Sequence, residues 1–221
     1  MHKSVSLADQ VYERLEKDIL SGKYTRGTIL TELRLCEDLG VSRTPVREAL
    51  RTLEQEHIVE SCPKGVTVLS ITVEDADAIY GIRERIEGMA AAGCARNITD
   101  EQIRALSDVL SLQEFYAARH DSEKVQEMDS AFHEMIYRFS GSSILSNTLF
   151  PLHNKIQKFR KNAVEYPHRA NESIAEHRRI LEAIASRDPD AADRAITEHA
   201  KAAHKRLIEV ANSASEEGNT L

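Results

Sequence analysis

Helical periodicity in the first third of the chain predicts three short helices. One is expected over residues 8–22, a second over residues 31–39, and a third that begins at Ser42, whose side chain suits an N-cap position. Pro45 then falls in the first helical turn, where its missing N–H costs nothing. The expected apolar faces are Val11, Leu15 and Ile19 in the first helix and Val46, Ala49, Leu50 and Leu53 in the third.

The pattern changes after His57 from a helical period to extended segments. IVESC and VTVLSI read as two strands, and the turn residues Pro63, Lys64 and Gly65 between them indicate a hairpin. Three short helices followed by a hairpin are typical of a winged helix-turn-helix. We therefore predict such a domain over residues 1–70.

From Thr72 onward the helical period returns and persists almost to the end. Breaks are predicted near residues 97–100, 120–122, 140–143, 166–171 and 188–190, which leaves about six helices that can pack as a bundle. Pro151 interrupts one helical pattern and predicts a kink or a short break. We expect a mainly α protein, with an all-α domain over residues 71–212 and a frayed tail over residues 213–221.

Composition and cysteine usage fit an ordinary globular protein in a reducing compartment. Hydrophobic residues make up 41% and charged residues 29% of 221 positions, and the apolar runs are too short to cross a bilayer. The start of the chain lacks the apolar core of a secretion signal, and the three cysteines are far apart. These features predict a cytoplasmic location and no membrane partner.

The net charge of −7 argues against general affinity for nucleic acid. Residues 1–70 contain 10 basic and 11 acidic side chains, and the remainder contains 19 and 25. Neither half is basic, so DNA binding would depend on a local patch.

Such a patch is predicted on the third helix, where Arg43, Arg47 and Arg51 recur every four residues opposite the apolar face. The start of this helix, with Ser42 and Thr44, can hold a phosphate at its unpaired N–H groups, and arginine further along can reach a guanine edge. A solvated arginine stripe is the simpler interpretation of the helix alone. The order of two helices, a capped third helix and a hairpin favours DNA binding by this arginine face.

The stretch TELRLCEDLGVSRTPVREALRTLEQEHIVE resembles the winged helix-turn-helix of GntR-type bacterial transcription regulators. The resemblance implies that Arg43, Thr44 and Arg47 contact operator DNA and that Gly65, beside Lys64, brings the wing to the DNA backbone. Two positions depart from the family pattern: His57 stands where glycine is usual, and Arg34 where an acidic residue is common.

Four polar side chains in the second half fall on apolar helical stripes. Asp129 and His133 are four residues apart within the stripe of residues 125–139, and His177 and His199 lie on two later stripes. The turn at Asp188 lies eleven residues from each of these two histidines, so antiparallel helices would hold them at similar depth, about 16 Å from the turn at a rise of 1.5 Å per residue.

A divalent cation is the simplest group that satisfies one buried carboxylate and three neutral imidazoles. Each histidine taken alone is more often a hydrogen-bonded core residue, and Asp129 can also bond His133 or a backbone donor. The occurrence of all four on stripes favours a metal centre. The remaining histidines are interpreted as structural or solvated: His2, His57, His120, His153, His168 and His204.

Residues 72–210 resemble the FCD ligand-binding domain that follows this winged helix in one GntR subfamily, through IYGIRERIEGMAA, DSAFHEMI and EHRRILEAI. The resemblance implies that Asp129, His133, His177 and His199 coordinate a metal and that a carboxylate effector binds beside it. It also matches Arg83 to an arginine facing the effector. An ion pair of Arg83 with Glu87 is the alternative, and Arg160 is a weaker candidate for which a surface role is the simpler reading.

Three histidines and one aspartate suit zinc first, and nickel or manganese also fit. An octahedral ion would keep two positions for a small carboxylate or a sugar acid.

A metal-dependent hydrolase is the main alternative, but Tyr137 stands where the zinc-protease motif HExxH requires its second histidine. A metal-free pocket for an acyl ligand is a third reading, for which these polar groups are poor lining.

The sequence therefore predicts a homodimeric transcription regulator and not an enzyme. Repression is the favoured mode of regulation, and activation is the alternative. Its dimer would read a palindromic operator in double-stranded DNA, under the control of a small organic acid.

Overall fold

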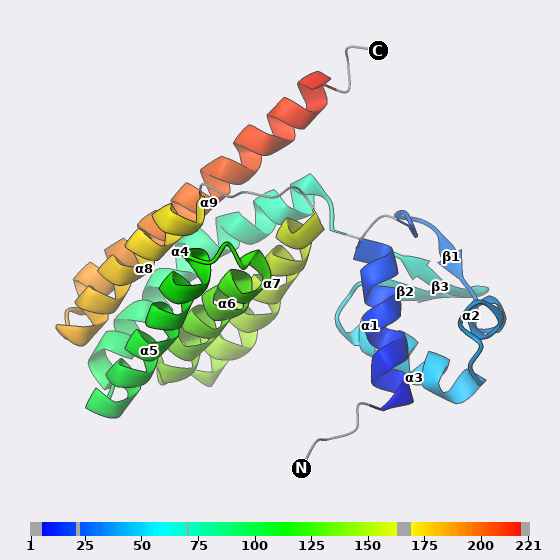
Figure 1. The fold of residues 1–221 in the computed structure, drawn as a ribbon, viewed down its shortest axis with the longest axis horizontal. Coiled ribbons are helices and arrows are strands. Elements are labelled where there is room, and N and C mark those ends of the chain that lie inside the picture. Colours follow the sequence, from blue (N-terminus) through cyan, green and yellow to red (C-terminus); the bar gives the residue numbers. More distant parts are fainter. Residues whose placement is uncertain (1–5, 21–22, 70, 163–168, 218–221) are drawn as a thin grey trace. The chain divides into compact units, whose positions relative to one another are not determined.

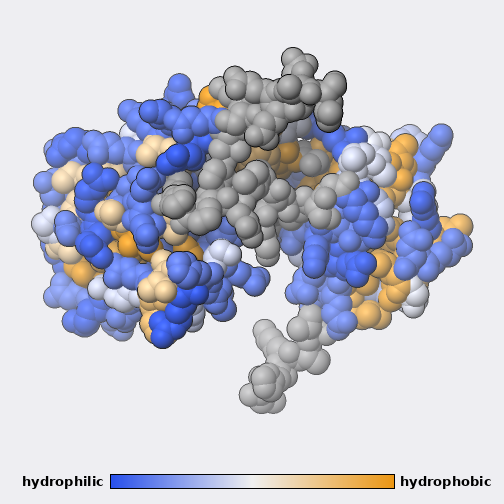
Figure 2. All heavy atoms as spheres, turned by 45° about the horizontal axis from the view of Figure 1, so that its top comes forward, coloured by the Kyte–Doolittle hydropathy of each residue, from blue (hydrophilic) through white to orange (hydrophobic). Residues whose placement is uncertain are grey.

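A computed structural model describes residues 6–20, 23–69, 71–162 and 169–217. The chain divides into two compact units, Met1–Thr72 and Val73–Leu221, each with its own hydrophobic core (Figure 1). On the face drawn in Figure 2, hydrophilic residues cover most of the described surface of each unit. None of the described helices is long and apolar enough to span a bilayer.

The N-terminal unit contains three helices and a small sheet in its described part. The helices are α1 (Leu7–Leu20), α2 (Glu32–Leu39) and α3 (Arg43–Gln55), and the strands are β1 (Ile29–Leu30), β2 (Val59–Cys62) and β3 (Gly65–Val68). The predicted winged helix is confirmed by this order. Its core joins the expected apolar faces of α1 and α3 with Leu35 of α2 and with strand residues: Val11, Leu15, Ile19, Leu35, Val46, Leu53, Val59 and Val68.

The sheet is antiparallel with the order β1-β3-β2, and its third strand was not predicted from the sequence. Cys62 pairs with Gly65 at the end of the β2–β3 hairpin, so Pro63 and Lys64 form its two-residue turn. On the other edge of β3, Leu30 of β1 pairs with Val66. Two residues are too short a segment for the alternation of a strand to be recognised in a sequence.

The C-terminal unit is a bundle with six helices in its described part. These are α4 (Val73–Asn97), α5 (Asp100–Ala117), α6 (Ser122–Phe139), α7 (Ser143–Asn162), α8 (Arg169–Ala185) and α9 (Pro189–Glu217). α4 packs along α9, α5 packs against α6 and α8, and α6 and α7 pack against α4. Their shared core includes Leu106, Phe132, Ile136, Leu149, Ile180, Ile184 and Ile196.

Several ends of these helices fall where the sequence predicts them. Asp188 accepts hydrogen bonds from the N–H groups of Asp190 and Ala191, and Pro189 is the first residue of α9. α7 runs through Pro151 without interruption, so the short break considered at that residue does not occur. α9 continues through residues 213–217 of the segment expected to be frayed.

In the described part of the chain, three helices are followed within three residues by a non-glycine residue in the left-handed conformation. His57, His120 and Arg187 follow α3, α5 and α8 with φ of 55°, 57° and 55°. In each case the next residue donates its N–H to a carbonyl five positions back, as Ile58 does to Leu53. The conformation at His57 explains why glycine is the usual residue at this position of the motif.

Candidate functional site

The exposed face of α3 carries the side chains predicted to read DNA. Arg43, Thr44, Arg47 and Arg51 are exposed, whereas the Val46 and Leu53 positions are buried in the core. Ser42 takes the N-cap position with an extended backbone, and its hydroxyl makes no capping hydrogen bond in the described structure. The start of α3 therefore presents backbone N–H groups, the hydroxyls of Ser42 and Thr44 and the positive side chain of Arg43.

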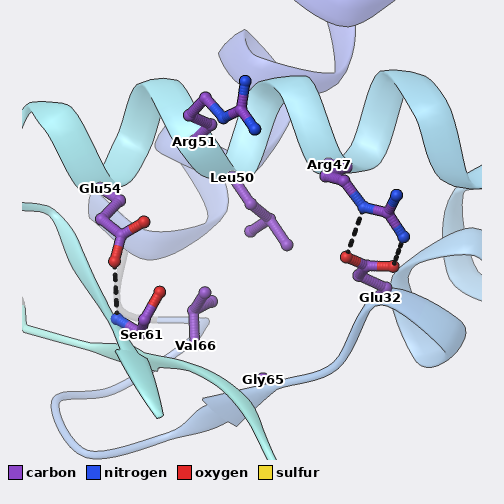
Figure 3. A pocket seen from close by; sticks show the side chains of 8 residues that line it. All are labelled: Glu32, Arg47, Leu50, Arg51, Glu54, Ser61, Gly65 and Val66. Atoms are coloured by element: carbon purple, nitrogen blue, oxygen red, sulfur yellow. Dashed lines mark hydrogen bonds and ion pairs between the residues drawn. The ribbon is translucent and has the colours of Figure 1, made fainter.

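Arg47 is held by an acidic side chain of the preceding helix (Figure 3). Its Nε and Nη2 each donate to one carboxylate oxygen of Glu32, both at 2.9 Å. The hydrogen bond from Arg47 is the main cause that lowers the pKa of Glu32. The two-pronged contact fixes the plane of a guanidinium that is otherwise largely exposed. Sequence reasoning placed Arg47 on this surface but did not find its partner.

The hairpin contributes Gly65 to a groove whose other wall is α3, and Lys64 precedes Gly65 in the turn. The groove is lined by Glu32, Arg47, Leu50, Arg51, Glu54, Ser61, Gly65 and Val66 (Figure 3). Lys64 is exposed. Gly65 has φ of 146°, and a Cβ atom there would lie 2.2 Å from the carbonyl oxygen of Leu30. The packing of β1 against the hairpin thus requires glycine at this position whether or not DNA is bound.

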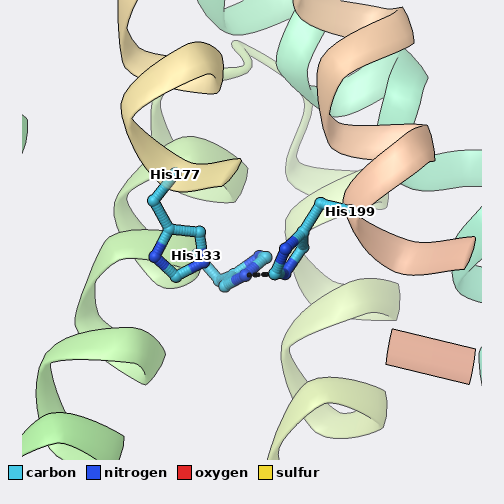
Figure 4. Close-up of side chains that lie close together, drawn as sticks. All are labelled: His133, His177 and His199. Atoms are coloured by element: carbon cyan, nitrogen blue, oxygen red, sulfur yellow. Dashed lines mark hydrogen bonds between the residues drawn. The ribbon is translucent and has the colours of Figure 1, made fainter. Parts of the chain in front are cut away.

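In the C-terminal unit, three of the predicted metal ligands converge inside the bundle. His133 from α6, His177 from α8 and His199 from α9 are buried, and one ligand atom from each lies within 4.8 Å of the others (Figure 4). Their ring centroids are 4.8–5.2 Å apart. The equal-depth argument from the sequence is therefore supported by the positions of these histidines.

Asp129, one helical turn before His133 on α6, lies at the same cluster. Its Oδ1 is 3.6 Å from Nε2 of His177, and its side chain is buried. Its Oδ2 accepts a hydrogen bond from the side-chain amide of Gln157 on α7. The four residues singled out in the sequence thus come together from three helices.

The outward-facing nitrogen of each histidine in this cluster has a partner that fixes the position of its proton. His177 Nδ1 lies 2.9 Å from Oε1 of Gln113, and His199 Nδ1 lies 2.7 Å from Oε2 of Glu176. His133 Nδ1 lies 3.4 Å from the hydroxyl of Tyr137. Because these partners accept hydrogen bonds, each Nδ1 carries the proton and each Nε2 keeps its lone pair.

The Nε2 atoms of His133 and His199 face each other at 3.2 Å (Figure 4). In the tautomers that the Nδ1 partners favour, two lone pairs meet at that distance and repel unless a cation lies between them; otherwise one Nε2 must carry a proton and donate it to the other. Neutral imidazoles with Nδ1–H groups bound to acceptors, next to a buried carboxylate, are the usual donor set of a divalent transition metal. The donor set therefore fits a metal ion.

A second buried polar group lies beside this cluster and involves Arg83 of α4. Its Nε donates to Oε1 of Glu87 at 2.7 Å, and Tyr137 donates its hydroxyl to the same oxygen. Burial alone would lower the pKa of Arg83, but Glu87 raises it, so the guanidinium stays charged. Burial and then Glu87 raise the pKa of Tyr137, so the phenol keeps its proton. Of the two readings of Arg83, the structure contains the ion pair with Glu87.

One polar atom of this group is left without a donor. Oε2 of Glu87 is buried and has no hydrogen-bond partner among the described residues. The side chain of Arg160, the other predicted effector residue, lies outside the described side chains.

Several polar residues near the cluster were missed in the sequence. Gln113, Glu176 and Gln157 were not singled out, because a polar residue beside an apolar stripe gives no pattern of its own. His153, interpreted as structural or solvated, is buried on α7 with its ring 4.7 Å from that of His133. Its signal was present, because Leu149, His153 and Ile156 share one helical face and all three are buried.

Comparison with known proteins gives two matches that together cover most of the chain. The family described as bacterial regulatory proteins, gntR family, matches residues 7–69, and the FCD domain matches residues 78–202. Both matches agree with the resemblance read from the sequence.

Individual relatives are similar over nearly the same span. YdhC of Bacillus subtilis, an uncharacterized HTH-type transcriptional regulator, is 31% identical over 193 residues, 86% of either chain. The HTH-type transcriptional repressor RspR of Escherichia coli is 28% identical over 86% of this chain and 84% of its own. The solved structure of E. coli McbR/YncC covers 93% of this chain and 99% of its own, with 26% identity and a TM-score of 0.73. This chain therefore belongs to the GntR family of bacterial regulatory proteins, as a DNA-binding transcription regulator with an FCD domain and not as an enzyme.

Proposed function

We propose that this regulator is a homodimeric repressor whose affinity for a palindromic operator is set by a small carboxylate or sugar acid bound at a divalent metal ion. It would act in the cytoplasm, where the operator is. The proposed DNA contacts are Ser42, Arg43, Thr44, Arg47, Lys64 and Gly65. The proposed metal ligands are Asp129, His133, His177 and His199.

The proposal for DNA rests on the exposed start of α3. Backbone N–H groups at a helix start attract phosphate, and an arginine whose plane is already fixed can present two parallel N–H groups to guanine. One good contact of this kind contributes about 1–3 kcal/mol of discrimination between bases. A symmetric dimer would place two such helices in successive major grooves.

The observation that carries the metal proposal is the common orientation of three histidines, whose Nε2 atoms face one another while their Nδ1 atoms bind acceptors. Zinc is the first candidate for this donor set, and nickel or manganese also fit it. When bound, the ion supplies a Lewis-acid site for oxygen atoms of an organic acid. Effector roles for Arg83 and Arg160 stay predictions, since a carboxylate would have to compete with Glu87 for Arg83.

The proposed DNA contacts are tested with DNA fragments that the protein selects from its source genome. Fluorescence anisotropy measures the affinity of the protein for a selected fragment. Arg43→Ala and Arg47→Ala are expected to weaken binding to the selected fragment by at least about tenfold each, from the loss of a charge-assisted contact. Arg104→Ala, which removes an exposed arginine of α5, is the matched control and is expected to bind as the wild type does. Wild-type affinity in both α3 variants would refute the assigned surface.

The sensing part is tested by metal analysis together with a thermal-shift screen of small organic acids. Purified wild-type protein is expected to retain about one divalent ion per chain, and His177→Ala is expected to lose it. A selective acid should raise the melting temperature only of metal-loaded protein and should change operator affinity. An acid that acts equally on the metal-free protein would contradict the role of the ion.

A further inference from the structure

His153 of α7 is buried beside the cluster but is not one of the four proposed metal ligands. It is 2% exposed, although a histidine with no polar task is rarely kept inside a hydrophobic core. One helical turn after His153, the side chain of Gln157 donates a hydrogen bond to Asp129. This part of α7 therefore already contacts one of the proposed ligands.

The His153 ring lies as close to His133 as the three proposed ligand rings lie to one another. Its centroid is 4.7 Å from that of His133, and the three proposed ligand rings are separated by 4.8–5.2 Å. Its Nε2 is 4.0 Å from Oδ2 of Asp129, while His177 Nε2 is 3.6 Å from Oδ1. Two imidazoles thus approach the same carboxylate, one near each oxygen.

The protonation of His153 also suits a ligand. The side-chain nitrogen of Gln157 lies 3.2 Å from His153 Nε2 and also donates to Asp129, so the amide is oriented with its N–H groups toward both residues. A ring nitrogen that accepts an N–H carries no proton of its own, so Nε2 of His153 has the unprotonated form that a ligand needs. Its single lone pair is taken by the Gln157 N–H in this structure, so an ion at Nε2 would replace that hydrogen bond.

A separate ion at His153 is disfavoured, although Glu87, His133 and His153 also lie within 4.8 Å of one another. Glu87 already neutralises the buried Arg83, so a cation there would lie beside a guanidinium. His133 directs the proton of its Nδ1 toward Tyr137 and has only one lone pair to offer. His153 therefore belongs with the ion of the first cluster.

Taking the proposed metal centre as its premise, we infer that His153 is a fifth protein ligand of the ion, in addition to Asp129, His133, His177 and His199. The ion would then join α7 to α6, α8 and α9. Five protein donors leave one position of a six-coordinate ion for an effector, where four donors leave two. An organic acid would bind through a single oxygen atom, and its second polar group would have to meet protein.

The test uses full-length protein loaded with Zn²⁺ or Co²⁺ and no effector. X-ray absorption of the zinc protein is expected to count four imidazoles in the wild type and three in His153→Ala. The Co²⁺ form of His153→Ala is expected to change the position and intensity of its visible bands. Competition with a chromophoric chelator should show that His153→Ala binds Zn²⁺ at least about tenfold more weakly than the wild type.

Free imidazole provides a rescue that a structural role cannot imitate. Added to His153→Ala, it should fill the space of the missing ring and restore the wild-type Co²⁺ spectrum. His120→Asn is the control, since it removes an exposed imidazole outside the cluster and asparagine tolerates the left-handed backbone. If His153→Ala does not fold, His153→Gln gives the same comparison with a side chain of similar length.

The outcomes separate this inference from the function on which it rests. Wild-type protein that binds neither ion would refute the metal centre itself. Wild-type protein that binds ions, with a His153→Ala variant of unchanged affinity and spectrum, would refute only the fifth ligand. Weaker affinity with an unchanged spectrum and imidazole count would also overturn it, because His153 would then act on Asp129 from outside the coordination sphere.

Discussion

The two units hold their proposed functional side chains in opposite places. In the N-terminal unit, Arg43, Thr44 and Arg47 are exposed and lie over a cluster of buried apolar side chains. In the C-terminal unit, Asp129 and the clustered histidines lie inside the bundle. A contact surface can therefore change in the first unit with little effect on folding, whereas in the second unit the chemistry of the site and the stability of the fold depend on the same residues.

The largest effect that would sharpen this contrast is expected at Glu87. Glu87→Ala leaves the buried guanidinium of Arg83 without its carboxylate, and should lower the unfolding free energy of the C-terminal unit by about 3–5 kcal/mol. Urea denaturation followed by circular dichroism measures this. The double variant Arg83→Met with Glu87→Leu removes both charges and should lose much less. Equal losses in the single and double variants would show that the unpaired charge is not the cause.

Gly65 is the position where the contrast should break, because it lies on the proposed DNA surface and also fixes the fold. Gly65→Ala brings a Cβ atom against the Leu30 carbonyl and should destabilise the N-terminal unit by roughly 2–3 kcal/mol. Thermal unfolding measures the loss, and metal content should not change. Lys64→Ala, one residue earlier and exposed, is expected to stay within about 0.5 kcal/mol of wild type. A stable Gly65→Ala protein would mean that β1 can move away.

A smaller effect is predicted at the left-handed helix ends, which occur in both units. His57→Gly should stabilise the N-terminal unit by about 1 kcal/mol, because glycine adopts φ of 55° without steric cost. His120→Gly should give a similar gain in the C-terminal unit only. Differential scanning calorimetry of the two variants tests whether each gain stays within its own unit. A gain in neither variant would contradict the cost assigned to this conformation.

The smallest effect concerns His204 on α9, which lies between two carboxylates of α4. Its Nδ1 is 2.6 Å from Glu84 and its Nε2 is 2.8 Å from Asp77. Partial burial lowers the pKa of His204, but the hydrogen bonds to Asp77 and Glu84 outweigh it and raise the pKa above the usual 6.5. Its contribution to stability is therefore complete below about pH 6.5 and is lost as the pH rises through the higher folded-state value.

The comparison for His204 is with His204→Gln, which cannot gain a proton. The difference in melting temperature between wild type and variant should be largest in mildly acidic buffer and should shrink toward alkaline pH. A difference that grows with pH would reverse the sign of the assigned shift.

Much of the fold was predictable because periodicity reports burial directly. The helices of both units, the hairpin and the cluster of Asp129, His133, His177 and His199 all follow from which positions face a core. Hydrophobic period alone can place a polar residue inside, provided that its helical neighbours three and four positions away are apolar.

The parts that could not be predicted depend on contacts between distant segments. Nothing local to Arg47 reveals its pairing with Glu32, and nothing local to Gly65 reveals Leu30. His153 was missed for a different reason, since it follows the apolar Leu152, and a single histidine next to an apolar residue does not show which of the two faces the core. The choice between an ion pair and an effector contact for Arg83 likewise depends on burial, which its sequence neighbours do not determine.

The close packing of Leu30 against Gly65 has a consequence for the thermodynamics of recognition. Since β1 pairs with one edge of β3 and β2 with the other, the hairpin tip is ordered before any DNA arrives. A preorganised loop loses little conformational entropy on association. The wing should therefore contribute its contacts at almost full strength, and swapping β1 for a flexible segment would weaken operator binding even with every contact residue intact.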